Sequence, residues 1–264
     1  TDIVHTIKED LIIQSTPGGP FQNADRTLSA RTDGQLVIDP GIVVKLGGSR
    51  IEATISSQVI AEGTEARPIV FTSIDDDRFG GVTEEARNTV DRPAAPGDWG
   101  GIYIGQSARL SMDHTTLAYA GGVTRIPGSS AAFNAIELHQ AQAARIANSQ
   151  FENNASGVGG IGEERRAGRG THGVGTIFVR GSQPILIGNQ VVGTVGTDTP
   201  VVSIDVNSLN AKELPDYGRS RGQLDRFELF DDNQGPLIRD NVLDGNPVNG
   251  MVIREGVLAT ESVW

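Results

Sequence analysis

A short apolar frame occurs four times in this chain and constrains its fold more than any other feature of the sequence. Its copies are Met112-x-His114-x-x-Leu117, Ile146-x-Asn148-x-x-Phe151, Ile187-x-Asn189-x-x-Val192 and Ile238-x-Asp240-x-x-Leu243. The intervals between copies lengthen along the chain while the spacing inside each copy stays the same. Self-similarity of this kind, with periods of about 20–50 residues, is typical of stacked repeats.

The stretch 98–121 shows what one repeat contains. Apolar residues alternate at Ile102 and Ile104, resume at Leu110 and Met112, and end at Leu117 before a glycine pair. Short alternating segments divided by polar turns indicate three strands per coil, because a helix would place its apolar residues three and four apart. We therefore predict an all-β fold, a right-handed parallel β-helix (solenoid) with long loop insertions between its coils.

The composition agrees with one narrow solenoid. The chain has 34 glycines among 264 residues and only 5% aromatic residues, which suits tight corners around an aliphatic interior. The repeats run nearly to the end of the chain without a low-complexity linker. We predict a single module over residues 1–264, with an N-terminal strand or cap region at 1–33, coils at 34–254, and a tail at 255–264 that leads to a following module.

The first coils carry the clearest strand signals. Glycine and proline interrupt the apolar runs at Pro40-Gly41 and Gly47-Gly48, where the backbone φ is fixed or must be positive. Strands are expected near Leu36–Ile38, Ile42–Leu46, Arg50–Ile55, Gln58–Ala61 and Ile69–Thr72.

Three segments in this part of the chain carry a family resemblance. The segments LVIDPGIVVKL, VIAEGTEARPIVFTS and GDWGGI occur in this order within residues 34–121. They resemble the repeats of large bacterial surface and secreted proteins of the right-handed parallel β-helix (pectate-lyase-like) superfamily. The resemblance implies the fold and an extracellular or cell-surface location. The head TDIVHT and the tail ESVW also resemble the two sides of a module junction, so the expected partners are neighbouring modules of the same chain or end-to-end self-association.

The charge and cysteine counts exclude several classes of function. The net charge of −11 and the lack of a Lys/Arg run argue against nucleic-acid binding and against anionic membranes. The absence of cysteine excludes a disulfide scaffold and a cysteine metal site. No apolar run approaches the roughly 18 residues of a membrane-spanning helix, so no membrane insertion is expected.

An acidic loop gives the one candidate metal site. Asp75, Asp76 and Asp77 follow a predicted strand, and Asp98 precedes the next one. Ca²⁺ takes six to eight oxygen ligands from carboxylates and carbonyls on flexible loops, so these four residues could hold it. The alternative is that they are solvated loop acids, with Asp98 capping a turn.

The polar residues of the recurring frame are expected to form a structural ladder. Equivalent positions of successive coils stack about 4.8 Å apart, so His114, Asn148, Asn189 and Asp240 would lie in one row at a corner. Asparagine suits such a corner because it tolerates left-handed φ. Asp113 and His114 could form a base and its orienting acid, but adjacent strand residues point to opposite faces, so we expect that this pair does not meet.

Carbohydrate chemistry is the main enzymatic alternative. Glu228, Asp231 and Asp232 could supply paired carboxylates, although the sequence around them favours a turn. Polygalacturonase-like hydrolases carry Asp-Asp before Gly-His-Gly, whereas here Thr-His-Gly at 171–173 precedes Asp-Asp at 231–232. The aromatic residues Trp99, Tyr103 and Tyr119 could stack on sugars, but we expect them to cover the outer faces of strands.

Two functions follow from these observations. The first is a non-catalytic structural or adhesive module of a large extracellular bacterial protein, with Ca²⁺ as a candidate stabilising ion and carbohydrate as a candidate ligand. The alternative is a polysaccharide lyase or glycoside hydrolase that acts on an acidic polysaccharide in a groove lined by the loops at 75–97, 121–134 and 157–174. Fold alone does not choose between them, because a β-helix supports both.

Overall fold

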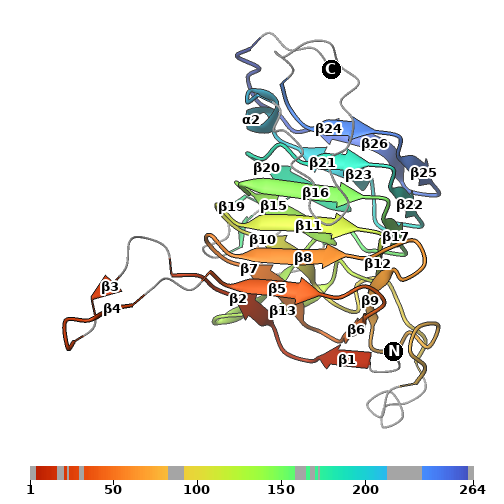
Figure 1. Ribbon diagram of the computed structural model, residues 1–264. Coiled ribbons are helices and arrows are strands. Elements are labelled where there is room, and N and C mark those ends of the chain that lie inside the picture. Colours follow the sequence, from red (N-terminus) through yellow and green to blue (C-terminus); the bar gives the residue numbers. More distant parts are fainter. Residues whose placement is uncertain are drawn as a thin grey trace.

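The computed structural model is a parallel β-helix with three sheets that run the length of the molecule (Figure 1). It describes residues 4–16, 21–22, 24–29, 33–82, 92–157, 165–166, 170–171, 173–212 and 234–260. Within these residues the only helix is α2 (Val206–Leu209), whose first turn is capped by the side chain of Asp205. No helix in the described part of the chain has the length and apolar character needed to cross a membrane.

Each complete coil contributes one strand to each of three sheets, and β25 and β26 in the described part of the chain extend sheets 1 and 2 by one further strand. Sheet 1 contains, in order, β1 (Val4–Ile7), β6 (Val43–Leu46), β9 (Ile69–Ser73), β12 (Thr115–Ala118), β17 (Gln150–Glu152), β22 (Gln190–Val192) and β25 (Val242–Asp244). Sheet 2 contains β2 (Leu11–Ile13), β7 (Arg50–Ala53), β10 (Gly101–Ile104), β15 (Ile136–His139), β20 (Ile177–Arg180), β23 (Pro200–Ile204) and β26 (Val248–Ile253). Sheet 3 contains β5 (Gln35–Ile38), β8 (Gln58–Glu62), β11 (Arg109–Asp113), β16 (Ala143–Ala147), β21 (Ile185–Ile187) and β24 (Leu237–Arg239).

The chain visits sheet 2, sheet 3 and sheet 1 in turn, and all pairs within these sheets are parallel. The predicted three-strand coil and the parallel β-helix are thereby confirmed. The five strands expected between residues 34 and 74 correspond to β5 to β9, with ends that differ by at most two residues. β1 and β2 pair directly with β6 and β7, so the coils begin before residue 34.

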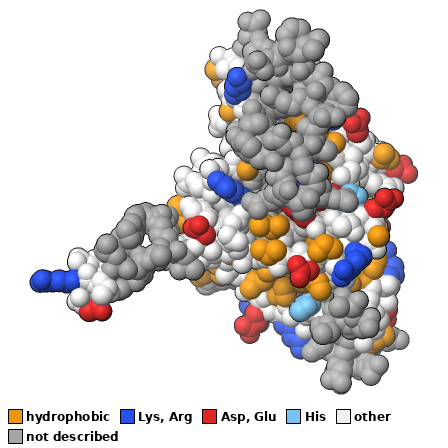
Figure 2. Space-filling view, in the orientation of Figure 1, with side chains coloured by type: hydrophobic (Ala, Val, Ile, Leu, Met, Phe, Trp, Pro, Cys, Tyr) orange, Lys and Arg blue, Asp and Glu red, His pale blue; other side chains and the backbone are white. Residues whose placement is uncertain are grey.

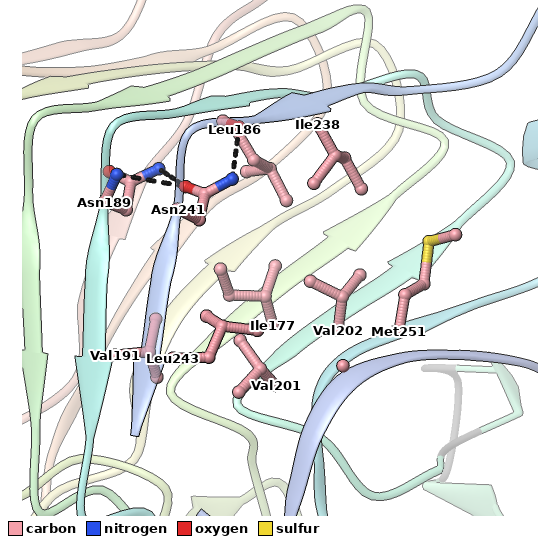
Figure 3. A pocket seen from close by; sticks show the side chains of 11 residues that line it. Ile177, Leu186, Asn189, Val191, Val201, Val202, Ile238, Asn241, Leu243 and Met251 are labelled. Atoms are coloured by element: carbon pink, nitrogen blue, oxygen red, sulfur yellow. Dashed lines mark hydrogen bonds between the residues drawn. The ribbon is translucent and has the colours of Figure 1, made fainter. Parts of the chain in front are cut away.

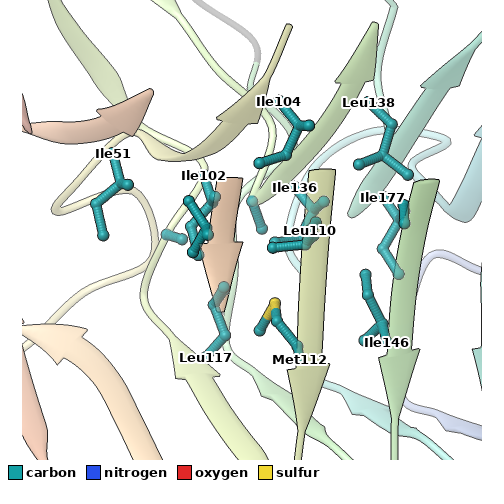
Figure 4. Packing of buried hydrophobic residues seen from close by; sticks show 14 of the residues in the cluster. Ile51, Ile102, Ile104, Leu110, Met112, Leu117, Ile136, Leu138, Ile146 and Ile177 are labelled. Carbon is teal, nitrogen blue, oxygen red and sulfur yellow. The ribbon is translucent and has the colours of Figure 1, made fainter. Parts of the chain in front are cut away.

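Aliphatic side chains fill the interior in rows that run along the solenoid axis (Figure 4). One row in sheet 2 joins Ile51, Ile102, Ile136 and Ile177, all of them buried. Complete burial of such a side chain stabilises the fold by about 1.5–3 kcal/mol, so the rows are the main source of stability. Trp99 also lies in this core and donates its indole N–H to the Ala118 carbonyl, so the expectation that it covers an outer strand face is wrong.

Among the described residues, three antiparallel hairpins interrupt the coils. The pair β13 (Val123–Ile126) and β14 (Ser129–Ala132) contributes Ile126 and Ala131 to a small cluster with Tyr103 on the outer face of sheet 2. The pair β3 (Phe21–Gln22) and β4 (Leu28–Ser29) stands away from the solenoid near its N-terminal end (Figure 1). The third pair is β18 (Arg165–Arg166) and β19 (Gly170–Thr171).

The side of the solenoid shown in Figure 2 carries a mixed surface. Hydrophobic side chains gather near the first coils, and charged side chains are scattered around them. Val37 of β5 contributes to the exposed hydrophobic surface, and Ile60 of β8 is its cross-strand neighbour.

Candidate functional site

The corner between sheets 3 and 1 contains the predicted ladder, with one correction. His114, Asn148 and Asp240 follow the last aligned residues of β11, β16 and β24, and all three have positive φ, between 45° and 57°. In the third coil this position is taken by Gly188, with φ 65°, and Asn189 lies one residue further on. The row is therefore a left-handed corner, which favours glycine and asparagine.

The displaced Asn189 belongs to a different ladder, which ties each coil to the one before it. Its Oδ1 accepts the Ser149 N–H at 3.0 Å, and its Nδ2 donates to the Ile146 carbonyl at 2.9 Å. Asn241, its neighbour in the next coil, accepts the Asn189 N–H and donates to the Leu186 carbonyl in the same way. These amides satisfy backbone groups that a corner would otherwise leave unpaired.

A second asparagine ladder follows sheet 1 and was missed by the sequence reasoning. Asn154 accepts the Ala120 N–H at 2.8 Å and donates to the Leu117 carbonyl at 3.1 Å. Asn246 makes the equivalent pair of bonds with Thr194 and Val191. The signal was present in the sequence, since each asparagine lies three residues after a core position of the recurring frame.

Asp113 and His114 do meet, so the expectation that they point apart is wrong. His114 Nδ1 lies 2.5 Å from Asp113 Oδ1. The rule of opposite faces holds for extended residues, whereas His114 has left-handed φ and turns its ring back toward Asp113.

Asp113 is the centre of a polar network on the outer face of sheet 3. Its side chain is only 1% exposed, and it accepts hydrogen bonds from Arg145 Nη1 at 2.9 Å and from Asn148 Nδ2 at 3.1 Å. Burial by itself would raise the pKa of Asp113, but the hydrogen bonds from Asn148, Arg145 and His114 outweigh it and lower the pKa below its ordinary value. The carboxylate is therefore ionised at neutral pH.

Glu62 extends this network by one coil. It is the cross-strand neighbour of Asp113, so the backbones of the two residues lie about one strand spacing, ~4.8 Å, apart along the axis. Ser111 donates to Glu62 Oε1 at 2.5 Å. Two carboxylates with a histidine and an arginine are the groups that sugar chemistry uses, yet Glu62, Asp113 and Arg145 are buried against one another.

The acidic loop is held by arginine side chains. Asp76 is buried and receives two bonds from the Arg78 guanidinium, both at 3.0 Å, and one from Thr72 Oγ1 at 2.5 Å. Burial would raise the pKa of Asp76, but the bonds from Arg78 and Thr72 dominate and lower it. Arg78 also bonds Glu152 Oε2 at 2.8 Å, which connects the loop to β17 in the next coil but one.

Arg92 engages two of the other predicted metal ligands. Its Nη2 lies 3.0 Å from Asp75 Oδ2 and 2.8 Å from Asp98 Oδ1. Asp98 also accepts bonds from Ser73 Oγ and the Ala95 N–H, as a turn-capping residue does. Asp77 is exposed. Among the described residues, no group of three or more His, Cys, Asp or Glu side chains is placed to hold a metal ion.

A buried lysine on β6 forms a hydrogen bond to the same loop. Lys45 points outward from β6, is fully buried, and donates to the Gly81 carbonyl at 2.5 Å. Burial lowers its pKa, and the charges of Asp77, Asp76 and Asp75 oppose that shift. The loop that the sequence offered as a cation site thus receives its positive charge from Lys45, Arg78 and Arg92.

The outer face of sheet 2 carries another closed network. Arg50 bonds Glu52 at 2.8 Å, pairs with Asp10, and reaches Thr124 Oγ1 at 2.9 Å and the Arg125 carbonyl at 2.7 Å. Arg50 therefore links β7 to the β13–β14 hairpin.

Aromatic side chains from successive strands pack together on this outer face of sheet 2. Tyr103 stacks on His139 with 4.6 Å between ring centroids, and His139 lies 5.2 Å from Phe178. His139 Nε2 bonds Glu137 Oε2 at 2.8 Å, and the Arg254 guanidinium covers Phe178 at 4.1 Å. Tyr103 thus covers the outer face of its strand, as expected, and is itself buried.

A cavity of about 50 Å³ lies inside the last coils (Figure 3). Its walls are aliphatic, from Ile177, Val202, Ile238, Leu243 and Met251, with Asn189 and Asn241 at one edge. It therefore offers no polar groups for chemistry beyond the two ladder amides.

Several predicted residues lie outside the described part of the chain. These are Glu228, Asp231, Asp232 and His172 of the Thr-His-Gly segment. Comparisons with protein-family models, with curated proteins and with solved structures found no match for this chain.

Proposed function

We propose that this chain is a non-catalytic structural or adhesive module of a large extracellular protein. The observation that carries the proposal is the closure of its charged clusters. Asp113 on the outer face of sheet 3, Glu52 on that of sheet 2 and Asp76 in the acidic loop are each engaged by an arginine of the same fold. Buried ion pairs of this kind fix the positions of loops and strands and leave little freedom for a reacting group.

The architecture suits a rigid spacer. Seven strands stack in sheets 1 and 2, which gives a rod of roughly 30 Å at ~4.8 Å per coil. Stacked repeats contact only their neighbours, so length is gained by adding coils or further modules. The expected partners are neighbouring modules, and an extracellular or cell-surface location is part of the proposal because of the resemblance noted for residues 34–121. Carbohydrate is the candidate ligand of such a module.

Calcium is not required for this role, because arginines neutralise the candidate ligands Asp75, Asp76 and Asp98. The thermal midpoint should be the same in EDTA and in millimolar Ca²⁺. A specific site would instead raise stability by RT ln(1 + [L]/Kd). A rise with Ca²⁺ that disappears in an Asp75→Asn variant would establish calcium as a ligand of this loop.

The second candidate function is a polysaccharide lyase or hydrolase on the outer face of sheet 3. The observation that favours it is the adjacency of Glu62, Asp113, His114 and Arg145, which together offer acids, a base and a cation for a uronate. The tight burial of Asp113 counts against it, because a catalytic carboxylate must reach its substrate.

One assay separates the two functions. The protein is incubated with a panel of acidic polysaccharides, with and without Ca²⁺, while the absorbance of unsaturated products and the release of reducing ends are followed. We expect neither signal. Product formation that is lost in a His114→Ala variant, which keeps the buried Asp113–Arg145 pair, would overturn the structural proposal in favour of the enzyme.

A further inference from the structure

The strand β26 contains the only Asn-Gly pair of the sequence, at Asn249 and Gly250. Asparagine is one of the thermolabile residues of proteins. Glycine is the following residue that shields its own amide nitrogen least, because it has no Cβ. In a regular sheet the hydrogen bonds of the ladder hold each main-chain amide in place, so the local backbone decides whether such a pair can react.

The backbone at this pair forms a β-bulge against the preceding coil. The register of β26 on β23 shifts between Pro200 and Val202, so that Asn249 and Gly250 together lie opposite Val201. A bulge leaves its extra residue unpaired and disrupts the ladder locally. The main chain between Asn249 and Gly250 is therefore less constrained than the regular strand that follows it.

The hydrogen bonds of the Asn249 side chain favour attack on its amide carbon, Cγ. Asn249 is exposed, and its Oδ1 accepts bonds from Asn246 Nδ2 at 2.8 Å and from the Asn246 backbone N–H at 3.3 Å. Donors placed in this way stabilise the negative charge that develops on the oxygen when the carbon is attacked. Among the described residues, none accepts a bond from Asn249 Nδ2, so the group that must leave is not held.

We propose that Asn249 is a site of spontaneous deamidation. The Gly250 nitrogen loses its proton to solvent base and attacks Asn249 Cγ, so that a new C–N bond forms. The bond between Cγ and Nδ2 breaks, and Nδ2 takes up a proton and leaves as ammonia. Water then opens the cyclic imide: addition at Cγ gives aspartate, and addition at the main-chain carbonyl gives isoaspartate. Each event adds one negative charge to a chain whose net charge is already −11.

The two products act differently on the second asparagine ladder. Asn246 is a member of that ladder, since it accepts the Thr194 N–H and donates to the Val191 carbonyl. Aspartate at position 249 keeps an acceptor oxygen for Asn246, and the bond becomes charge-assisted. Isoaspartate carries the main chain through the former side-chain carbon and adds a methylene to β26, so the bond to Asn246 and the pairing with β23 compete. We expect only the isoaspartate form to loosen this corner.

The test follows each asparagine by peptide mapping and mass spectrometry while the folded chain is incubated in mildly alkaline buffer. Gly250→Ala is the matched variant, because a Cβ at Gly250 meets no atom within 4 Å, so alanine fits the fold while its methyl shields the attacking nitrogen. It should slow the conversion of Asn249 several-fold. The chain unfolded in urea gives the intrinsic rates. Asn249 should react in the folded chain within several-fold of its unfolded rate, whereas Asn148, whose Nδ2 is bonded to Asp113, should be slowed more by folding.

Two results would overturn the proposal. Conversion of Asn249 that is many-fold slower in the folded chain than in urea would show that the strand protects it. An equal rate in Gly250→Ala would show that the Gly250 nitrogen is not the nucleophile. Chromatography of the aged protein separates the aspartate and isoaspartate forms, which have the same mass. Hydrogen exchange at the Thr194 amide should be faster in the isoaspartate form, while Asn249→Asp should match the wild type; faster exchange in Asn249→Asp would contradict the expected effect on the ladder.

Discussion

The side chains on the sides of this solenoid and those of its last strand, β26, differ in how far they are buried and paired. On the sides, buried charges meet partners from other coils: Asp113 meets Arg145, and Arg78 joins Asp76 to Glu152. At the C-terminal end, Met251 and Ile253 remain exposed in rows that are buried elsewhere. The difference teaches that a row is buried where a further coil stacks on it, and that in the described part of the chain the row positions in β26 are only partly covered.

The largest effect is expected from opening the network on sheet 3. Asp113→Ala leaves Arg145 buried without its acid, and removal of one partner of a buried pair costs about 3–5 kcal/mol. Urea unfolding should show this loss in the midpoint. Asp240→Asn is the control, because Asp240 is exposed at the equivalent corner of a later coil and asparagine tolerates its positive φ; it should change stability by less than about 1 kcal/mol. Equal losses in the two variants would contradict the view that the buried pair of Asp113 and Arg145 contributes more to stability than an exposed corner residue.

Acid should lower the stability of the fold by weakening the buried charge pairs on the sides of the solenoid. The pKa values of Asp76 and Asp113 are lowered in the fold, so these groups stabilise it above the unfolded pKa of about 3.9 and lose that contribution as pH falls through the folded values. Stability measured by urea midpoint should therefore decline from about pH 5 downward. Asp113→Asn should flatten this decline, because one of the two titrating groups is gone. A stability that stays constant to pH 3 would contradict the assignment of these pairs.

A smaller effect is expected from the asparagine ladder. Asn189→Ala removes the bonds to Ser149 and Ile146 and leaves their backbone groups unpaired inside a corner, at a cost of about 1–3 kcal/mol. Hydrogen exchange should accelerate at the Ser149 amide in particular. Asn148→Gly is the informative comparison, because that residue has positive φ, which glycine adopts without strain. A larger loss in Asn148→Gly than in Asn189→Ala would show that the bond from Asn148 to Asp113 contributes more to stability than the ladder bonds of Asn189.

The sequence indicated the coil frame well because its main requirement, the alternation of core residues, is local. Core rows need aliphatic residues at alternate positions, which marked β5 to β12 accurately. The prediction that placed Asn189 in the corner row was wrong by one residue, and this error also has a local cause. Ile185, Leu186 and Ile187 are all apolar, so alternation cannot tell which of them point inward, and the corner residue Gly188 has no side chain to mark the turn.

What the sequence determined by itself, then, was a stack of three-stranded coils with an aliphatic interior and corners of glycine, asparagine and aspartate, since period and backbone φ are set by near neighbours. Only the tertiary structure decided which charges meet. Arg78 reaches Glu152, and Arg50 reaches Thr124, across more than 70 residues of chain. Such pairs depend on how the loops fold over the coils, and the same packing places Arg78 and Arg92 against the acids of the loop at 75–98.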